Sequence, residues 1–182
     1  ADYYRLAYDY TQTTHGQLIV MAGLSGSGKS TMARAIARSK STIHLRSDAI
    51  RKHLAGIQLD QKGDDAIYSA EMTAKTYDRL LALGLLLASQ GQTVILDAKY
   101  DRIVLRDPVL VQAQAAGIPV QFIHCEAPIA VLEARVAARS GDIADADVAV
   151  LSHQSFEGFT DAEQPFMKTI DTTQAVAAQL EL

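Results

Sequence analysis

A glycine-rich octapeptide that directly follows an apolar run constrains this chain more than any other feature of its sequence. The run spans residues 17–22 and reads Gln-Leu-Ile-Val-Met-Ala, and the octapeptide at residues 23–30 reads Gly-Leu-Ser-Gly-Ser-Gly-Lys-Ser. A short apolar run of this kind is typical of a central parallel strand that is buried on both faces. The pattern therefore predicts a strand, a glycine-rich turn and a helix in direct succession.

The predicted turn has the composition of a phosphate-binding loop. Its backbone N–H groups converge on phosphate oxygens, and the N-terminus of the following helix adds partial positive charge. Lys29 is placed to bridge the β- and γ-phosphates of a nucleoside triphosphate, and the Ser30 hydroxyl is the expected ligand of Mg²⁺. The residues predicted to contact the nucleotide are Gly23, Ser25, Gly26, Ser27, Gly28, Lys29, Ser30 and Thr31.

The loop alone does not choose between a kinase, a GTPase switch and a motor ATPase, because all three use it. The expected cofactors are ATP and Mg²⁺. GTP stays open as an alternative, because the sequence holds no motif that reads the base.

Predicted strands and helices alternate along the rest of the chain. Further strands are expected over 42–46, 93–96, 120–125 and 169–171, and helices over 30–39, 48–55, 66–90, 128–139 and 147–155, before Gly117 and after the last strand. This alternation indicates a parallel α/β sheet layered by helices. We therefore predict one α/β domain over residues 17–182, preceded by a connecting helix over residues 1–16 with a stripe of tyrosines.

The composition indicates how large a core the chain can form, which partners its charge favours and in which compartment it is expected. The 182 residues suffice for one substantial core, and the net charge of −4 does not indicate a general nucleic-acid surface. The longest apolar stretch, residues 80–88, is about half of the ~20 residues that a membrane-spanning helix needs. The single cysteine, Cys125, lies in an apolar run, so we expect a buried thiol and a cytoplasmic protein. The chain begins at Ala1 without an initiator Met, which is consistent with a fragment of something longer.

Asp48 and Arg51 follow the second predicted strand. They therefore lie at the carboxyl edge of the sheet, where open α/β sheets bind ligands. A carboxylate there can accept the proton of an attacking hydroxyl, while a cation one helical turn later holds an anionic group of the acceptor. The alternative is that Ser47 or Asp48 only caps the following helix.

Asp97 ends the third predicted strand. An acid after an apolar strand is typical of the group that completes the Mg²⁺ shell, usually through water. The alternative is a capping or salt-bridged Asp97, for example one paired with Lys99. The histidines show no metal-ligand spacing, and we expect a structural role for each of them: His44, His53, His124 and His153.

Arg135 and Arg139 are four residues apart and therefore share a helix face, just before a loop that contains Gly141. Two guanidinium groups on a closing lid would neutralise charge on the transferring phosphoryl group and exclude water. The alternative is a solvated helix face with a partner such as Glu133.

Taken together, these motifs resemble the P-loop kinase group that contains polynucleotide 5′-kinases, gluconate kinases and related small-molecule kinases. The resemblance rests on Gly-x-x-Gly-Ser-Gly-Lys-Ser-Thr, Ser-Asp-x-x-Arg, a strand ending Leu-Asp-Ala, and Arg-x-x-x-Arg, and it spans about residues 17–155. Residues 46–56 and 92–98 also resemble the kinase-like domain that is fused behind an aminoglycoside-phosphotransferase-like domain in bacterial proteins.

The resemblance implies a P-loop NTPase fold with a small lid and a five-stranded parallel sheet in the order 2-3-1-4-5. It implies that Asp48 activates the acceptor hydroxyl, that Arg51 binds the acceptor, and that Arg135 and Arg139 contact ATP. The segment Ala98-Lys99-Tyr100 departs from the polynucleotide-kinase pattern, so substrate contacts there do not carry over.

Three functions follow as hypotheses. The leading one is a kinase that transfers the γ-phosphoryl group of ATP to a hydroxyl of a small molecule or of a nucleic-acid 5′-end. The second is a nucleotide-binding regulatory module of a larger two-domain protein. The third is a polynucleotide 5′-kinase, which the acidic net charge does not favour.

Overall fold

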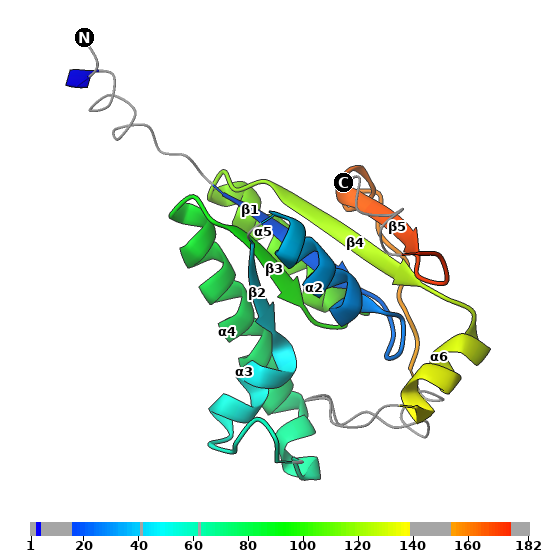
Figure 1. Cartoon of the computed structure of the whole chain (residues 1–182). Helices are drawn as coiled ribbons and strands as arrows, with labels where there is room; N and C mark the ends of the chain where they lie inside the picture. Colours follow the sequence, from blue (N-terminus) through cyan, green and yellow to red (C-terminus); the bar gives the residue numbers. More distant parts are fainter. Residues whose placement is uncertain (1–2, 5–15, 41, 62, 139–153, 176–182) are drawn as a thin grey trace.

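A parallel sheet forms the centre of the molecule, which is seen here in a computed structural model (Figure 1). The structure describes residues 3–4, 16–40, 42–61, 63–138 and 154–175. Within them lie the strands β1 (Gln17–Ala22), β2 (Ile43–Arg46), β3 (Thr93–Asp97), β4 (Val120–Glu126) and β5 (Met167–Asp171). All neighbours are parallel and the order is β2-β3-β1-β4-β5, so the predicted fold class and strand order are confirmed.

Helices connect the strands at nearly the expected positions. They are α2 (Lys29–Lys40), α3 (Ser47–Leu54), α4 (Ala70–Ser89), α5 (Ile103–Ala115) and α6 (Ile129–Ala137), with short 3₁₀ helices η1 (Asp65–Tyr68) and η2 (Gln164–Phe166). Within the described residues, no helix combines the length and the apolar character that crossing a bilayer requires.

The prediction of a single helix over residues 66–90 was wrong, because η1 and α4 occupy this stretch as two separate elements. Ser69 has an extended ψ of 157°, and its side chain accepts a hydrogen bond from the Met72 amide, so it ends η1 and caps α4. Of the predicted helix over 147–155, Gln154 and Ser155 are described and are not helical. The rest of that helix, most of the connecting helix over 1–16 and the helix expected after the last strand lie outside the described residues.

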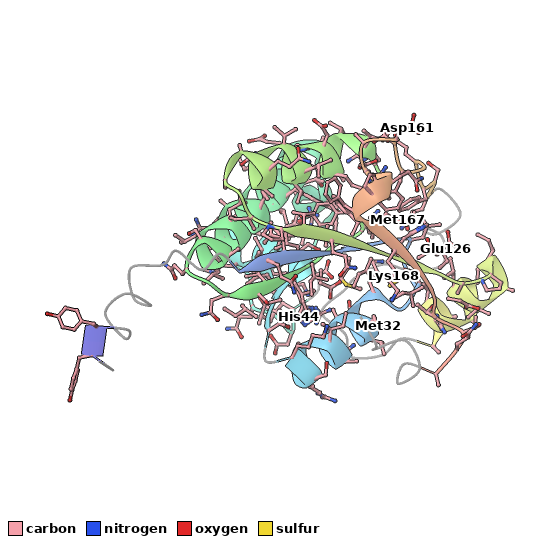
Figure 2. All side chains as sticks on the ribbon, turned by 90° about the horizontal axis from the view of Figure 1, so that it is seen from above. Met32, His44, Glu126, Asp161, Met167 and Lys168 are labelled. Atoms are coloured by element: carbon pink, nitrogen blue, oxygen red, sulfur yellow. The ribbon has the colours of Figure 1, made fainter. Side chains whose placement is uncertain are left out.

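Alternate residues of β1 face two separate apolar layers. Leu18, Val20 and Ala22 pack with side chains of α4 and α5, whereas Ile19 and Met21 pack with α2 on the other face. Figure 2 shows the sheet between α2, which carries Met32, and the green helices of the opposite layer. Because β1 pairs with β3 on one side and β4 on the other, its backbone and side chains are enclosed, and the position of its carboxyl end is fixed.

A buried ion pair ties the segment before β5 to α5. Arg106 is fully buried and contacts Glu163 at 2.7 Å, and its guanidinium also donates to the Tyr100 and Gly158 carbonyls. Burial would raise the pKa of the Glu163 carboxyl, but hydrogen bonds from Arg106 and Thr160 outweigh burial and hold the pKa below its usual value. The pair is therefore stabilising above the usual glutamate pKa, and this stabilisation is lost as the pH falls through the lowered pKa.

We expect Glu163→Gln to lower the free energy of unfolding by roughly 3 kcal/mol, because it leaves the Arg106 charge buried without its carboxylate. Urea unfolding at neutral pH measures the loss, and the variant should also lose less stability than the wild type between neutral and acid pH. Glu71→Gln is the matched control, since Glu71 pairs with Lys75 on the exposed surface of α4. Equal losses in the two variants would contradict this role of the buried pair.

Candidate active site

The carboxyl ends of the parallel strands meet at one edge of the sheet (Figure 1). The phosphate loop, residues 23–30, leaves β1 there, α3 begins directly after β2, and Asp97 ends β3. The register places Asp97 beside both Met21 of β1 and Arg46 of β2. Residues that are far apart in the sequence are thus brought to the edge at which open α/β sheets bind ligands.

Backbone conformations that favour glycine shape the phosphate loop. Gly23, Gly26 and Gly28 have φ values of 136°, 80° and 86°. A Cβ on Gly26 would lie 2.7 Å from the Leu132 carbonyl oxygen of α6. Glycine at this position therefore satisfies both the backbone conformation and the close approach of α6.

The Lys29 side chain lies within the loop. It is 91% buried, and its Nζ donates to the Leu24 carbonyl at 2.6 Å and contacts Ser27 Oγ at 3.4 Å. Lys29 is also the first residue of α2, whose first turn holds no acidic residue. The loop thus combines an ammonium group, backbone N–H groups and a helix N-terminus, a combination that suits phosphate.

Asp97 is buried and contacts two side chains of β2. His44 Nε2 lies 2.9 Å from Asp97 Oδ2, and Arg46 Nε lies 4.0 Å from the same oxygen. These contacts match the salt-bridged alternative for Asp97, although with partners other than Lys99, whose Nζ contacts Asp101 Oδ2 at 3.5 Å, and the Mg²⁺ role stays a prediction. Among the described residues, the contacts of Asp97 all fall on Oδ2, so Oδ1 can face a cation or its waters. This oxygen fits the Mg²⁺ role, for which Ser30 supplies the second predicted ligand.

Asp48 lies in the first turn of α3, and its side chain is 30% exposed. Arg46 Nη2 is 4.0 Å from Asp48 Oδ2, so one guanidinium contacts both Asp48 and Asp97. The N-cap of α3 is Arg46, which makes no side-chain cap hydrogen bond, and the catalytic role of Asp48 stays a prediction.

Arg51 lies on the inner side of α3. It is 93% buried, and its Nη1 donates to the Ile67 carbonyl at 2.9 Å and to Thr73 Oγ1 at 3.2 Å. The guanidinium also lies over the Tyr68 ring. These contacts hold η1 and the start of α4 against α3, and contact with an acceptor stays a prediction for Arg51.

Arg135 of α6 lies against the phosphate loop and the turn after β5. It donates to Thr172 Oγ1 at 2.9 Å, to the Thr172 carbonyl at 2.7 Å and to the Gly26 carbonyl at 3.4 Å. These contacts differ from the solvated face that the alternative assumed, and contact with ATP stays a prediction. Arg139, the second predicted lid arginine, lies outside the described residues.

His124 and Phe156 form a stacked pair near the phosphate loop. Their ring centroids are 4.2 Å apart, and His124 Nδ1 lies 3.1 Å from Glu126 Oε1. Burial, with smaller effects of Arg106 and Lys29, lowers the pKa of His124 despite the Glu126 carboxylate. A neutral imidazole at neutral pH follows, consistent with the structural role predicted for this histidine.

The segment that departs from the polynucleotide-kinase pattern is built into the core. Tyr100 has a left-handed φ of 44° and is 99% buried, and its ring lies edge-to-face with Tyr77 at 5.1 Å. Burial raises the pKa of Tyr100 above its usual value. Cys125 on β4 is buried as predicted, and burial raises the pKa of its thiol to about 12.

Sequence reasoning missed three residues that shape this site. Arg46 and His44 alternate with apolar Ile43 and Leu45 in β2, and this period-two pattern could have placed both of them on the face that meets Asp97. Gln154, which contacts Ser25 of the loop through two hydrogen bonds, carries no sequence signal.

The fold and the loop together define a P-loop protein. The chain belongs to the family AAA_33, described as an AAA domain, whose match covers residues 18–157. It is 28% identical over 145 residues to the uncharacterized proteins Rv2004c of Mycobacterium tuberculosis and Mb2027c of Mycobacterium bovis. The match covers 78% of this chain, and the chain spans less than a third of the length of these relatives.

Solved structures share the fold. A sugar kinase from Janibacter sp. HTCC2649 superposes with a TM-score of 0.67 at 21% identity, over 91% of both chains. The APS kinase CysC of Mycobacterium tuberculosis, in complex with AMPPNP and APS, gives 0.67 at 22% identity over 92% of this chain and 94% of that one. A gluconokinase from Sinorhizobium meliloti 1021 gives 0.59 at 23% identity over 93% and 89%.

We expect Gly26→Ala to lower the affinity for ATP by roughly tenfold or more, because the added Cβ forces the loop or α6 to move. Gly56→Ala is the matched control, since Gly56 also has a positive φ, of 71°, but open space around its Cβ position. Both substitutions should cost about 1–2 kcal/mol in stability through their left-handed backbone. Equilibrium binding of a fluorescent ATP analogue separates the two variants, and equal affinities would contradict the packing argument.

Proposed function

We propose that the chain is an ATP- and Mg²⁺-dependent kinase that transfers the γ-phosphoryl group to a hydroxyl of a small-molecule acceptor. One observation carries the proposal: Asp48 and Asp97, from two different strand ends, contact the same Arg46 guanidinium beside the phosphate loop. A nucleotide-binding module needs the loop and a metal ligand. A second carboxylate, partly exposed at the same edge, is what phosphoryl transfer to a hydroxyl adds.

Each group has a role in this reaction. Backbone N–H groups of the loop and Lys29 hold the phosphates, and Ser30 and Asp97 hold Mg²⁺, which supplies charge neutralisation when it is bound. Asp48 orients the acceptor hydroxyl and takes its proton as the new O–P bond forms and the bond to the leaving ADP breaks. Catalysis then rests on positioning and on charge neutralisation of the transferring group.

A small-molecule acceptor is favoured over a nucleic-acid end. The net charge is −4, and the Arg46 guanidinium at this edge is contacted by the carboxylates of Asp48 and Asp97, which would repel a polynucleotide. The solved structures of similar fold are named for a sugar, gluconate and APS as kinase substrates, so the fold supports several acceptors. The proposed acceptor is therefore a small molecule that carries a hydroxyl group.

A longer protein provides the context. Because the chain spans less than a third of its relatives, we take an N-terminal aminoglycoside-phosphotransferase-like domain, suggested by the resemblance above, as its proposed partner. The buried free thiol of Cys125 suits a reducing cytoplasm.

Asp48→Asn should lower kcat by about 10²- to 10⁴-fold and leave ATP affinity nearly unchanged, because the amide cannot take the acceptor proton. The assay is transfer of radiolabelled γ-phosphate from ATP and GTP into pooled metabolites and 5′-hydroxyl oligonucleotides. Asp60→Asn, an exposed position in the loop after α3, is the control and should keep full activity. Equal losses of binding and turnover in Asp48→Asn would count against the base role, and release of free phosphate alone would favour a regulatory module.

Asp97→Asn should raise the Mg²⁺ concentration for half-maximal nucleotide binding by about tenfold or more, because a neutral amide binds Mg²⁺ less strongly. Titration of Mg²⁺ into protein with a fluorescent ATP analogue measures the shift. Asp107→Asn on the exposed face of α5 should not move the titration. An unchanged Mg²⁺ requirement in Asp97→Asn would remove this residue from the metal site.

A further inference from the structure

One peptide group of the phosphate loop is held at both of its ends. The carbonyl of Leu24 accepts a hydrogen bond from Lys29 Nζ at 2.6 Å. The N–H of Ser25, which belongs to the same peptide plane, donates to Gln154 Oε1 at 3.1 Å. Gln154 Nε2 in turn donates to Ser25 Oγ at 3.1 Å. The carboxamide therefore makes two hydrogen bonds to one loop residue that is itself buried.

The chain that follows Gln154 is firmly attached. Phe156 stacks on His124 and packs against Phe159, and the Arg106 guanidinium lies 5.2 and 4.5 Å from these two phenylalanine rings. The Glu157 amide donates to the Asp101 carbonyl at 2.8 Å. Gln154 thus projects from a segment that is anchored to α5 and β4, and the orientation of its carboxamide is determined by this anchoring.

From this geometry we infer that Gln154 is a positioning residue for the triphosphate, an inference that rests on the proposed function. By fixing the Leu24–Ser25 peptide, Gln154 keeps the Leu24 carbonyl toward the Lys29 ammonium and away from the phosphates. Lys29 is the group that reaches the β- and γ-phosphates, so the carboxamide acts on the end of the site that distinguishes ATP from ADP.

The chemistry of the carboxamide suits this task. It offers one acceptor for the Ser25 amide and one donor for the Ser25 hydroxyl, and it brings no charge to a site that receives an anion. A carboxylate of the same size would keep the first bond but place negative charge beside the phosphates. A thioether of the same size would lose both bonds without adding charge.

Gln154→Glu and Gln154→Met test the inference through binding of fluorescent ATP and ADP analogues in the presence of Mg²⁺. The readout is the ratio of the two dissociation constants, which needs no acceptor. We expect Gln154→Glu to weaken ATP binding by roughly tenfold or more relative to ADP, through charge repulsion. Gln154→Met should weaken ATP binding relative to ADP binding by about threefold to tenfold, which is the effect expected from the loss of one or two hydrogen bonds.

Gln164→Glu is the matched control, because it introduces the same charge at an exposed position of the same segment and should leave the ratio unchanged. Urea unfolding of each variant shows that the protein is folded. A general loss of packing would weaken the binding of ATP and of ADP equally, and such an equal loss would overturn the inference. Tighter ATP binding in Gln154→Met would overturn it as well, since Gln154 would then obstruct the site. A wild-type protein that binds both nucleotides but phosphorylates no acceptor would contradict the proposed function alone.

Discussion

Three other parts of the chain closely surround the phosphate loop and restrict its shape. A side chain on Gly23 would meet the Cys125 carbonyl oxygen at 2.5 Å, one on Gly26 would meet α6 at 2.7 Å, and one on Gly28 would meet Thr172 at 3.1 Å. The carboxyl end of β4, helix α6 and the turn after β5 therefore approach the loop too closely for a side chain to fit without movement at these three positions. Because glycine has no Cβ, the neighbouring segments at this edge of the sheet can pack directly against the loop.

Buried cations fix the segments around this edge. Arg106 holds the segment before β5, Arg51 holds η1 and the start of α4, and Lys52 donates to the Leu59 and Gln61 carbonyls of the loop after α3. Each of these cations donates hydrogen bonds to carbonyl groups in segments outside the sheet. These hydrogen bonds hold the irregular backbone near the site in place. A charged side chain that the sequence suggests as a ligand-binding residue can therefore also stabilise the fold, as the contacts of Arg51 illustrate.

The sequence predicted the sheet well because local pattern determines it. The apolar run over residues 17–22 is β1 residue for residue, and the order of strands followed from the resemblance. The break at Ser69 was missed, since the apolar period continues across it and the capping residue was not read as a boundary. The contacts of Gln154 with Ser25 join residues 129 positions apart, and no spacing rule reaches that far. Local periodicity thus gives the elements, while the partners of polar side chains depend on tertiary contacts that periodicity does not encode.

Arg46 has a special place among the cations of the edge, because it contacts both carboxylates. Carboxylates at neighbouring strand ends repel each other, and a shared guanidinium offsets that repulsion. His44 contacts the same oxygen of Asp97 as Arg46 does, so two side chains of β2 orient the carboxylate at the predicted metal position. Strand β2, which lies at the edge of the sheet, therefore carries the side chains that contact both carboxylates of the candidate site.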